Sequence, residues 1–275
     1  MKDAMQYIDQ TITIGDAQAK LYGYVIDNSP EIDMRRTRPA VLIIPGGGYE
    51  MTSDREAEPI ALKLVAAGYH AFVLRYSVWP AVYPTALLQA ANAMTLIRAH
   101  AGQWHVDPTA ITVAGFSAGG HLAANLATTA GDEALRAHGH DPDATRPNGL
   151  MLAYPVLTSG EYAHRGSFDH LLGKRKDDPA MLEELSIERH VDAATPPTFL
   201  WHTITDDVVP VENSLMMIEA CHRAGVTIEA HLYPHGGHGL ALGTEETAWK
   251  GTEGIEPCVQ SWMSLFIAWL QRTFA

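Results

Sequence analysis

The sequence predicts an α/β fold in which helices cover both faces of a mostly parallel central sheet. Runs that are apolar on both faces, such as residues 40–45 and 110–116, recur along the chain, and runs with helical periodicity separate them. Buried parallel strands have this continuous apolar character, and strands that alternate with helices form βαβ units. Crossovers between parallel strands are right-handed, which places helices on both faces. With no internal repeat or change in composition, residues 1–275 are predicted to form one domain.

The order of elements follows from these runs. Further strands are predicted at 11–14, 21–26, 70–76, 149–156, 198–204 and 227–233, and helices at 56–67, 85–100, 118–129 and 212–224, before an amphipathic C-terminal helix. Gly68 and Gly225 follow two of these helices, where glycine is favoured. Residues 157–197 contain no strand and only a short helical pattern near 180–185. We expect this insertion to be either a lid or substrate-binding wall, or a plain surface excursion.

A nucleophile motif lies between a buried strand and a helix. Gly115-Phe-Ser-Ala-Gly119 matches G-x-S-x-G, with the apolar strand directly before it and the helix directly after. The sharp turn between the two strains the backbone at the serine and holds its hydroxyl at the helix N-terminus. Ser117 is therefore predicted to be a catalytic nucleophile. The alternative is that its side chain only caps the helix.

A glycine triplet supplies candidate oxyanion donors. Pro45-Gly-Gly-Gly-Tyr49 follows the strand at 40–45, and such a loop brings free backbone N–H groups close to a substrate carbonyl. The chain lacks the G-x-x-x-x-G-K-[ST] and G-x-G-x-x-G patterns of phosphate-binding loops. We predict that the N–H groups of Gly47, Gly48 and Ala118 form an oxyanion hole.

The serine needs a histidine base, and the base needs a carboxylate on its other ring nitrogen. His238 follows the last predicted strand in a glycine-rich loop and is the preferred base, with His235 as the competitor. Asp206 and Asp207 follow the preceding strand. Asp206 is preferred because it lies nearer the strand end, although spacing alone barely separates the two.

Together these motifs resemble the α/β-hydrolase superfamily, and within it the bacterial carbohydrate-type esterases near acetyl-xylan esterases and the hormone-sensitive-lipase-like group. The resemblance covers nearly the whole chain from Ala40 and is carried by PGGGY at 45–49, GFSAGGH at 115–121, DDVVP at 206–210 and HGGHG at 235–239. It implies the α/β-hydrolase fold, with the acid at Asp206 and the base at His238. It also implies deacetylation of acetylated sugars, xylo-oligosaccharides or other short-acyl esters.

Two departures concern the hormone-sensitive-lipase-like group. That group has HGGG where this chain has Pro45 before its glycines, which leaves open how the oxyanion loop is braced. It also tends to carry an acid five residues after the proline of a P-x-x-x-x-D stretch, where this chain has Gln89 after Pro84. The carbohydrate esterases therefore look closer.

Other polar and aromatic residues lie near these motifs in the sequence. Tyr49, Trp79 and Tyr83 fall on loops beside the predicted site, where they either contact substrate or pack in the core. His121, four residues after the serine, is expected to be a packed helix histidine. The spacing of histidines and acids near 138–143 predicts no metal site, and the predicted chemistry needs no cofactor.

Composition limits the partners. A net charge of −13 argues against nucleic acid and anionic membranes, so a small-molecule ester, such as an acylated carbohydrate, is the expected partner. No apolar segment follows Lys2, and 258–274 is too short and polar to span a membrane, which together predict a cytoplasmic enzyme. A homo-oligomer remains open. So do two other functions: an amide hydrolase such as an arylformamidase or small peptidase, and a non-catalytic binding module on a hydrolase scaffold.

Overall fold

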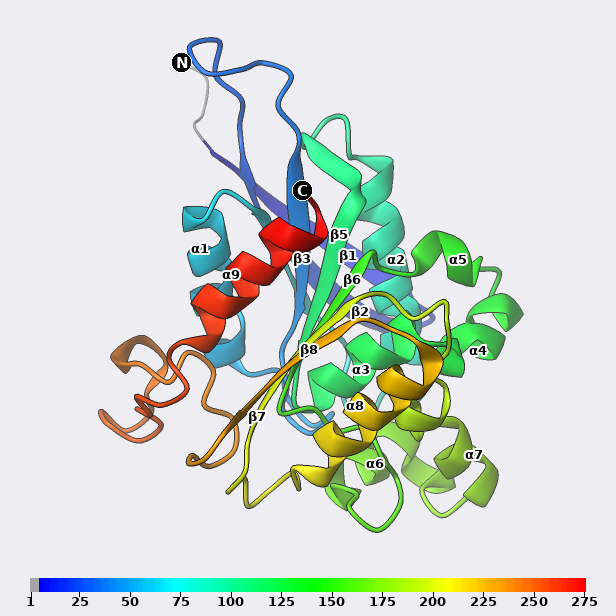
Figure 1. Cartoon of the computed structure of the whole chain (residues 1–275). Helices are drawn as coiled ribbons and strands as arrows, with labels where there is room; N and C mark the ends of the chain where they lie inside the picture. The colour runs from blue at the N-terminus through cyan, green and yellow to red at the C-terminus, as the bar shows by residue number, and fades with distance from the viewer. Residues whose placement is uncertain (1–4) are drawn as a thin grey trace.

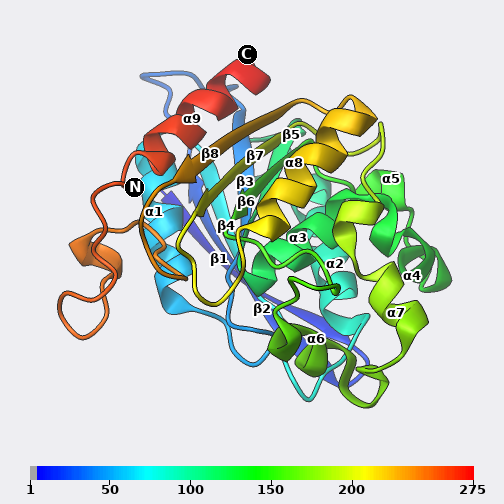
Figure 2. The same ribbon diagram turned by 60° about the horizontal axis from the view of Figure 1, so that its bottom comes forward.

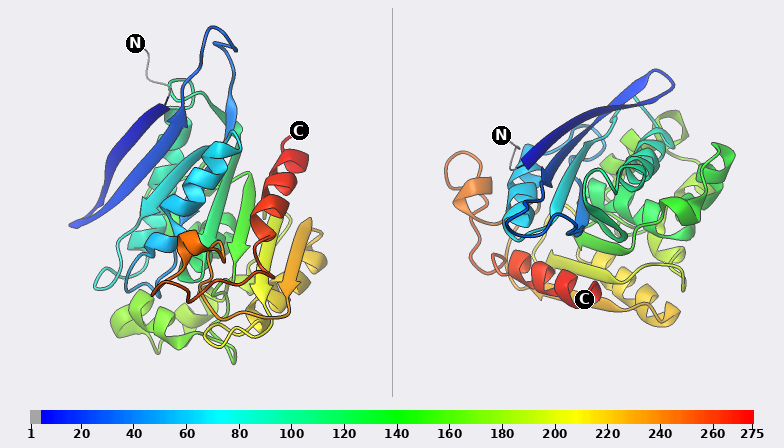
Figure 3. Two further views of the ribbon diagram at one scale, coloured as in Figure 1. Left: turned by 90° about the vertical axis from the view of Figure 1, so that its left-hand side faces the viewer. Right: turned by 90° about the horizontal axis from the view of Figure 1, so that it is seen from above.

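The computed structural model describes residues 5–275, which contain one eight-stranded sheet. The strand order across the sheet is β1-β2-β4-β3-β5-β6-β7-β8. The strands are β1 (Met5–Ile14), β2 (Ala17–Ile26), β3 (Arg38–Ile44), β4 (His70–Arg75), β5 (Val106–Phe116), β6 (Gly149–Ala153), β7 (Thr198–Thr203) and β8 (Ile228–Tyr233). Figure 3 shows the β1–β2 hairpin at one edge of the sheet and β8 at the other.

Strand direction divides the sheet into two parts. From β4 through β3, β5, β6 and β7 to β8 every neighbouring pair is parallel. The hairpin is antiparallel within itself and to β4. Both hairpin strands are longer than the sequence predicted, because pairing extends through polar positions on the exposed face of β1. The predicted fold class, a mostly parallel α/β sheet, is confirmed.

Helices cover both faces of the sheet (Figures 1 and 2). One face carries α1 (Glu58–Ala66) and α9 (Trp262–Thr273), and the other carries α2 (Thr85–Ala99), α3 (Ala118–Ala127) and α8 (Glu212–Ala224). Alternate residues of β3 enter the two cores: Val41 and Ile43 pack on the α1–α9 side, and Leu42 and Ile44 on the other. This division explains why the strand reads as a continuous apolar run.

Several short helices lie outside the βαβ pattern: α4 (Asp132–Ala137), α5 (Pro142–Thr145), α6 (Arg165–Leu172) and α7 (Pro179–Glu184). Only α7 coincides with a pattern identified in the sequence. Helices α5 and α7 begin with a capping aspartate, Asp141 or Asp178, followed by proline at the first helical position. Such helices are too short to show an amphipathic period. In the sequence they can be identified only by the capping aspartate and the proline that follows it.

The carboxyl ends of the parallel strands meet at the lower edge of the sheet in Figure 1, where α6 also lies. The turn after β5, the glycine loop after β3 and the loops after β7 and β8 all open at this edge. In open α/β sheets this is the edge at which ligands bind. None of the helices within residues 5–275 has the length and apolar character needed to cross a bilayer.

Candidate active site

Ser117 occupies the turn between β5 and α3. It is the residue that precedes the first turn of α3, with φ of 51°, in a region that side chains other than glycine rarely adopt. A Cβ atom added at Gly115 would lie 2.4 Å from the carbonyl oxygen of Gly119, and one added at Gly119 would lie 2.2 Å from that of Ile44. Both glycines are therefore required for the turn to form against β3. The strained turn holds the Ser117 hydroxyl at the edge of the sheet.

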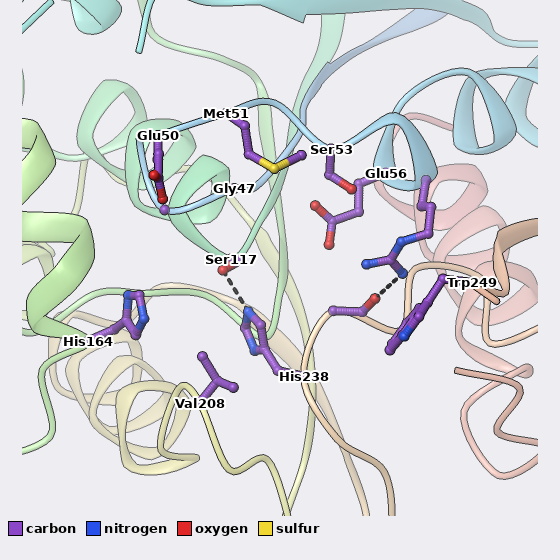
Figure 4. Close-up of a pocket in the computed structure, with 13 residues that line it drawn as sticks. Gly47, Glu50, Met51, Ser53, Glu56, Ser117, His164, Val208, His238 and Trp249 are labelled. Atoms are coloured by element: carbon purple, nitrogen blue, oxygen red, sulfur yellow. Dashed lines mark hydrogen bonds between the residues drawn. The ribbon is translucent and has the colours of Figure 1, made fainter. Parts of the chain in front are cut away.

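The structure brings His238 and Asp206 to this serine. Ser117 Oγ lies 2.7 Å from His238 Nε2, and His238 Nδ1 lies 2.7 Å from Asp206 Oδ2 (Figure 4 shows the first of these bonds). Because the carboxylate only accepts, His238 Nδ1 carries the proton and Nε2 accepts from the serine hydroxyl. His235, the competing candidate, is exposed, and its carbonyl accepts from the thiol of Cys258.

Asp206, rather than Asp207, contacts the histidine. Asp206 Oδ2 accepts from His238 and His202, while Oδ1 accepts from the N–H groups of Val208 and Val209. Burial alone would raise the pKa of this carboxyl, but the hydrogen bonds from the two histidines outweigh it and hold the pKa well below the ordinary value. Asp206 is therefore ionised at neutral pH. Asp207 is exposed to solvent.

His202 is a neighbour of this site that sequence analysis missed. It is fully buried on β7, and its Nε2 lies 3.1 Å from both Asp206 Oδ2 and the carbonyl oxygen of Val209. Both are acceptors, so Nε2 carries the proton, and Nδ1 accepts from the Ser214 hydroxyl at 2.7 Å. A histidine inside an otherwise apolar strand was the available signal. The hydrogen bond from His202 is the second one that Asp206 Oδ2 accepts, and it orients the carboxylate toward His238.

Replacing His202 with phenylalanine keeps a ring in the core and removes this second donor. We expect stability to fall by about 1–3 kcal/mol, since Ser214 and Asp206 lose a partner. We also expect kcat/KM for a short-acyl ester to fall roughly 10- to 100-fold per folded molecule, because Asp206 is freed to turn. Thermal unfolding and steady-state kinetics measure the two effects. The matched control is His70→Phe, another fully buried histidine with backbone partners, at the opposite end of the sheet. If both variants keep equal activity, His202 has no role beyond stability.

The predicted oxyanion donors lie around Ser117. Among residues 5–275, the N–H groups of Gly47, Gly48 and Ala118 donate to no backbone or side-chain acceptor, whereas Gly46 N–H is engaged by the Glu56 carboxylate. Gly47 and Gly48 have φ of 125° and 66°, a region that favours glycine, and a Cβ atom added at Gly47 would lie 2.3 Å from the carbonyl oxygen of Met51. The triplet thus turns two successive amides away from internal bonding, which leaves them available to an oxygen at Ser117.

A cleft of about 410 Å³ opens over the serine. Ser117 and His238 lie in this cleft, and the glycine loop and residues between it and Glu56 form one part of its lining. His164, Val208 and Trp249, from three loops distant in sequence, form another part (Figure 4). This volume lies in the range of small-molecule sites.

The three aromatic residues considered as substrate contacts do not line this cleft. Tyr49 and Tyr83 are buried, and their hydroxyls bond His121 Nδ1 and Glu184 respectively. Trp79 is 47% exposed and lies against Gly173 rather than beside Ser117. The chain after Tyr49 turns back on Gly47, and the tyrosine ring packs in the core against Tyr76 and against His121 of α3. Their expected role as substrate contacts is therefore not supported, and Tyr49 and Tyr83 pack in the core.

His121 is a packed helix histidine. Its Nε2 donates to the carbonyl of Leu185 and its Nδ1 accepts from Tyr49, and burial lowers its pKa to about 4. It is therefore neutral and fully hydrogen-bonded at neutral pH. No group of three or more histidine, cysteine or acidic side chains suited to a metal is present within residues 5–275.

The insertion at 157–197 reaches the site. His164, just before α6, lines the cleft, and His170 on α6 lies 2.9 Å through Nδ1 from the carbonyl oxygen of Gly48. Since that carbonyl accepts, Nδ1 of His170 carries the proton. The insertion thus contacts both the cleft and the glycine loop.

Comparisons with known proteins identify the family of the chain. The BD-FAE family matches residues 29–220. The chain is 35% identical over 222 residues to endo-1,4-beta-xylanase B of Butyrivibrio fibrisolvens, covering 78% of this chain and 35% of that protein. It is 30% identical over 210 residues to an acetylxylan esterase of Xylanibacter ruminicola, covering 74% of this chain and 42% of that protein. The chain thus spans less than half the length of these two relatives.

The alignment with one solved structure covers most of both chains. The acetyl ester-xyloside bifunctional hydrolase of Caldicellulosiruptor lactoaceticus aligns over 92% of this chain and 88% of its own, with 39% identity and a TM-score of 0.78. This likeness supports the fold class, a mostly parallel sheet with helices around it. The chain belongs to the BD-FAE family and has the α/β-hydrolase fold.

Proposed function

We propose that the chain is a carboxylic ester hydrolase that acts through Ser117, His238 and Asp206 by way of an acyl-enzyme. One observation carries the proposal: an unbroken chain of hydrogen bonds runs from the Ser117 hydroxyl through His238 to an ionised, buried Asp206. This is the arrangement that serine hydrolysis requires. The esterase names of the relatives support the same reaction class.

The reaction divides into two steps. Ser117 Oγ attacks the ester carbonyl carbon while its proton passes to His238 Nε2, and the carbonyl oxygen becomes an oxyanion held by the N–H groups of Gly47, Gly48 and Ala118. The intermediate collapses when His238 returns the proton to the leaving alcohol, which leaves the acyl group on Ser117. A water molecule then attacks the acyl carbon while its proton passes to His238 Nε2. As the acyl–Oγ bond breaks, His238 returns this proton to Ser117 Oγ, which releases the acid and restores the serine. Asp206 holds the imidazole in the tautomer that both steps need.

The proposed substrates are short-acyl esters of sugars, including acetylated xylo-oligosaccharides. Relatives named for acetylxylan and acetyl ester-xyloside hydrolysis support the sugar. His164, from the insertion at 157–197, lines the cleft, which supports a role of this insertion as a substrate-binding wall. We take residues 1–275 to be one α/β-hydrolase domain, in which Ser117, Asp206 and His238 follow the ends of β5, β7 and β8.

A substrate panel tests the proposal. Purified protein is assayed on acetylated xylo-oligosaccharides, on p-nitrophenyl esters of increasing acyl length, on a feruloyl ester and on a formyl anilide. We expect the largest kcat/KM on acetyl esters, with acetylated sugars exceeding the nitrophenyl ester of the same acyl group. A larger kcat/KM on the formyl anilide would place the chain among amide hydrolases. Absence of turnover on every compound, with tight binding of one, would favour a binding module.

A further inference from the structure

The short turn η1 (Asp54–Glu56) lies between the two loops on which the proposed chemistry depends. It follows the glycine loop, whose carbonyls at Gly46 and Gly47 accept from the N–H groups of Ser53 and Met51. It also faces the loop that carries His238. Two consecutive side chains of this turn, from Arg55 and Glu56, are hydrogen-bonded to these loops.

Glu56 holds the glycine loop. Its side chain is 3% exposed, and its Oε2 accepts from Gly46 N–H at 2.8 Å. A Cβ atom added at Gly46 would lie 2.8 Å from both Glu56 Oε2 and Ser117 Cβ, so the carboxylate, the loop and the serine are in close contact. Glu56 thus determines how near the triplet lies to the nucleophile.

The other oxygen of Glu56 reaches the histidine loop through Tyr154. Glu56 Oε1 accepts from the Tyr154 hydroxyl at 2.7 Å, and that hydroxyl accepts from Ala241 N–H at 3.0 Å. The Tyr154 ring also lies edge-on to His238, with centroids 5.1 Å apart. Burial, and next the nearby Glu56 charge, raise the pKa of Tyr154 well above its ordinary value, so the phenol stays protonated and donates to Glu56.

Arg55 holds the same loop from its other side. Its Nη1 donates to the carbonyl of Gly239, the residue after His238. The guanidinium lies over the Trp249 ring, 4.2 Å from the centroid, and a Cβ atom added at Gly254 would lie 2.4 Å from that ring. Trp249 therefore packs against both Arg55 and Gly254 and supports the guanidinium at the wall of the cleft.

We propose that Arg55, Glu56 and Tyr154 form a brace that sets the position of the His238 loop relative to the oxyanion donors. The inference rests on the proposed esterase function and deepens it, since it names the residues that position the base relative to the oxyanion donors. All three are positioning residues. Gly46 and Tyr154 donate to different oxygens of Glu56, and a carboxylate presents an acceptor at both positions, whereas an amide presents an acceptor at only one.

The test replaces members of the brace and measures transition-state stabilisation. In Glu56→Gln the amide keeps one acceptor and loses the other, so Gly46 and Tyr154 can no longer both donate to it. We expect kcat/KM for p-nitrophenyl acetate to fall roughly 10- to 100-fold, with KM nearly unchanged. Tyr154→Phe should give a loss of similar size. The double variant should lose no more than the larger single loss, because both changes break one connection.

A second readout separates positioning from folding. A trifluoromethyl ketone takes up Ser117 Oγ at its carbonyl carbon and places an oxyanion among the N–H donors, so its inhibition constant should rise in parallel with the loss of kcat/KM. Active sites are counted by titration with a fluorophosphonate, and kinetics are expressed per titrated site. The matched controls are Glu58→Gln, which removes a carboxylate paired with Arg75, and Tyr233→Phe, whose hydroxyl bonds only Ser261 among the described residues. Both should retain activity per site.

The outcomes are distinct. If Glu56→Gln and Tyr154→Phe both have the wild-type kcat/KM per titrated site, the brace proposal is wrong and the esterase proposal is unaffected. A wild-type protein that neither turns over the ester nor reacts with the fluorophosphonate overturns the esterase proposal itself. If Glu56→Gln does not fold, Tyr154→Phe and Arg55→Lys decide, since Arg55→Lys keeps the charge and removes the planar bond to Gly239. Unchanged kinetics in both would equally overturn the brace.

Discussion

Replacing Ser117 with alanine is expected to lower kcat for p-nitrophenyl acetate by a factor on the order of 10⁶, as in other serine hydrolases that lose the nucleophile. The reason is that no other group can form the acyl-enzyme at this position. His238 Nε2 would face the methyl of alanine instead of a hydroxyl 2.7 Å away. The oxyanion donors would remain, so a small residual rate over water is expected. The measurement is single-turnover and steady-state release of nitrophenolate.

The variant should fold like the wild type. Alanine keeps the Cβ atom that already occupies the strained turn at φ of 51°, and the buried backbone bond from residue 117 N–H to Ala153 is unchanged. Ser264→Ala on α9, outside the cleft, is the control for loss of a serine hydroxyl. A Ser117→Ala protein that keeps the wild-type rate would contradict the assignment of the nucleophile and leave a non-covalent or non-catalytic role.

The second large effect is expected for Asp206→Asn, with kcat/KM lower by about 10⁴. The asparagine amide presents a donor where the carboxylate presented acceptors to His238 and His202. His238 would then favour the tautomer with its proton on Nε2, which cannot accept from Ser117. Parallel kinetics of Asp207→Asn provide the matched control, because Asp207 is exposed on the same loop. Equal losses in the two variants would contradict the choice of Asp206.

The same substitution has a stability effect whose sign depends on pH. The pKa of Asp206 in the folded protein lies below its ordinary value of 3.8, so ionisation of Asp206 stabilises the fold above that value. This contribution is lost as the pH falls through the folded-state pKa. The difference in unfolding free energy between wild type and Asp206→Asn should therefore be largest near neutral pH and should narrow in acid. Denaturant unfolding at a series of pH values measures it.

Local patterns were enough to predict the frame of the fold. The continuous apolar runs predicted β3 and β5, Gly68 and Gly225 marked two helix ends, and the strand-turn-helix around Ser117 follows from residues adjacent in sequence. These features depend on burial and backbone geometry that neighbouring residues determine together. The short helices α4, α5 and α6 were not predicted, because one or two turns carry no readable period.

The surroundings of the site depended on contacts between distant segments. The order of motifs along the chain predicted Ser117, His238 and Asp206. It barely separated Asp206 from Asp207, because the difference lies in which of the two side chains is directed into the protein. It missed the Glu56–Tyr154 bond, which joins residues 98 positions apart, and the second histidine on Asp206. It also left Tyr49 open between substrate contact and core packing, and the structure shows the ring buried. The sequence by itself thus determines which side chains follow the ends of the strands. Which of these side chains contact one another is decided by the packing of the loops beyond the strand ends. The reason is that their hydrogen bonds join atoms from distant segments, and the whole sheet determines the distances between those segments.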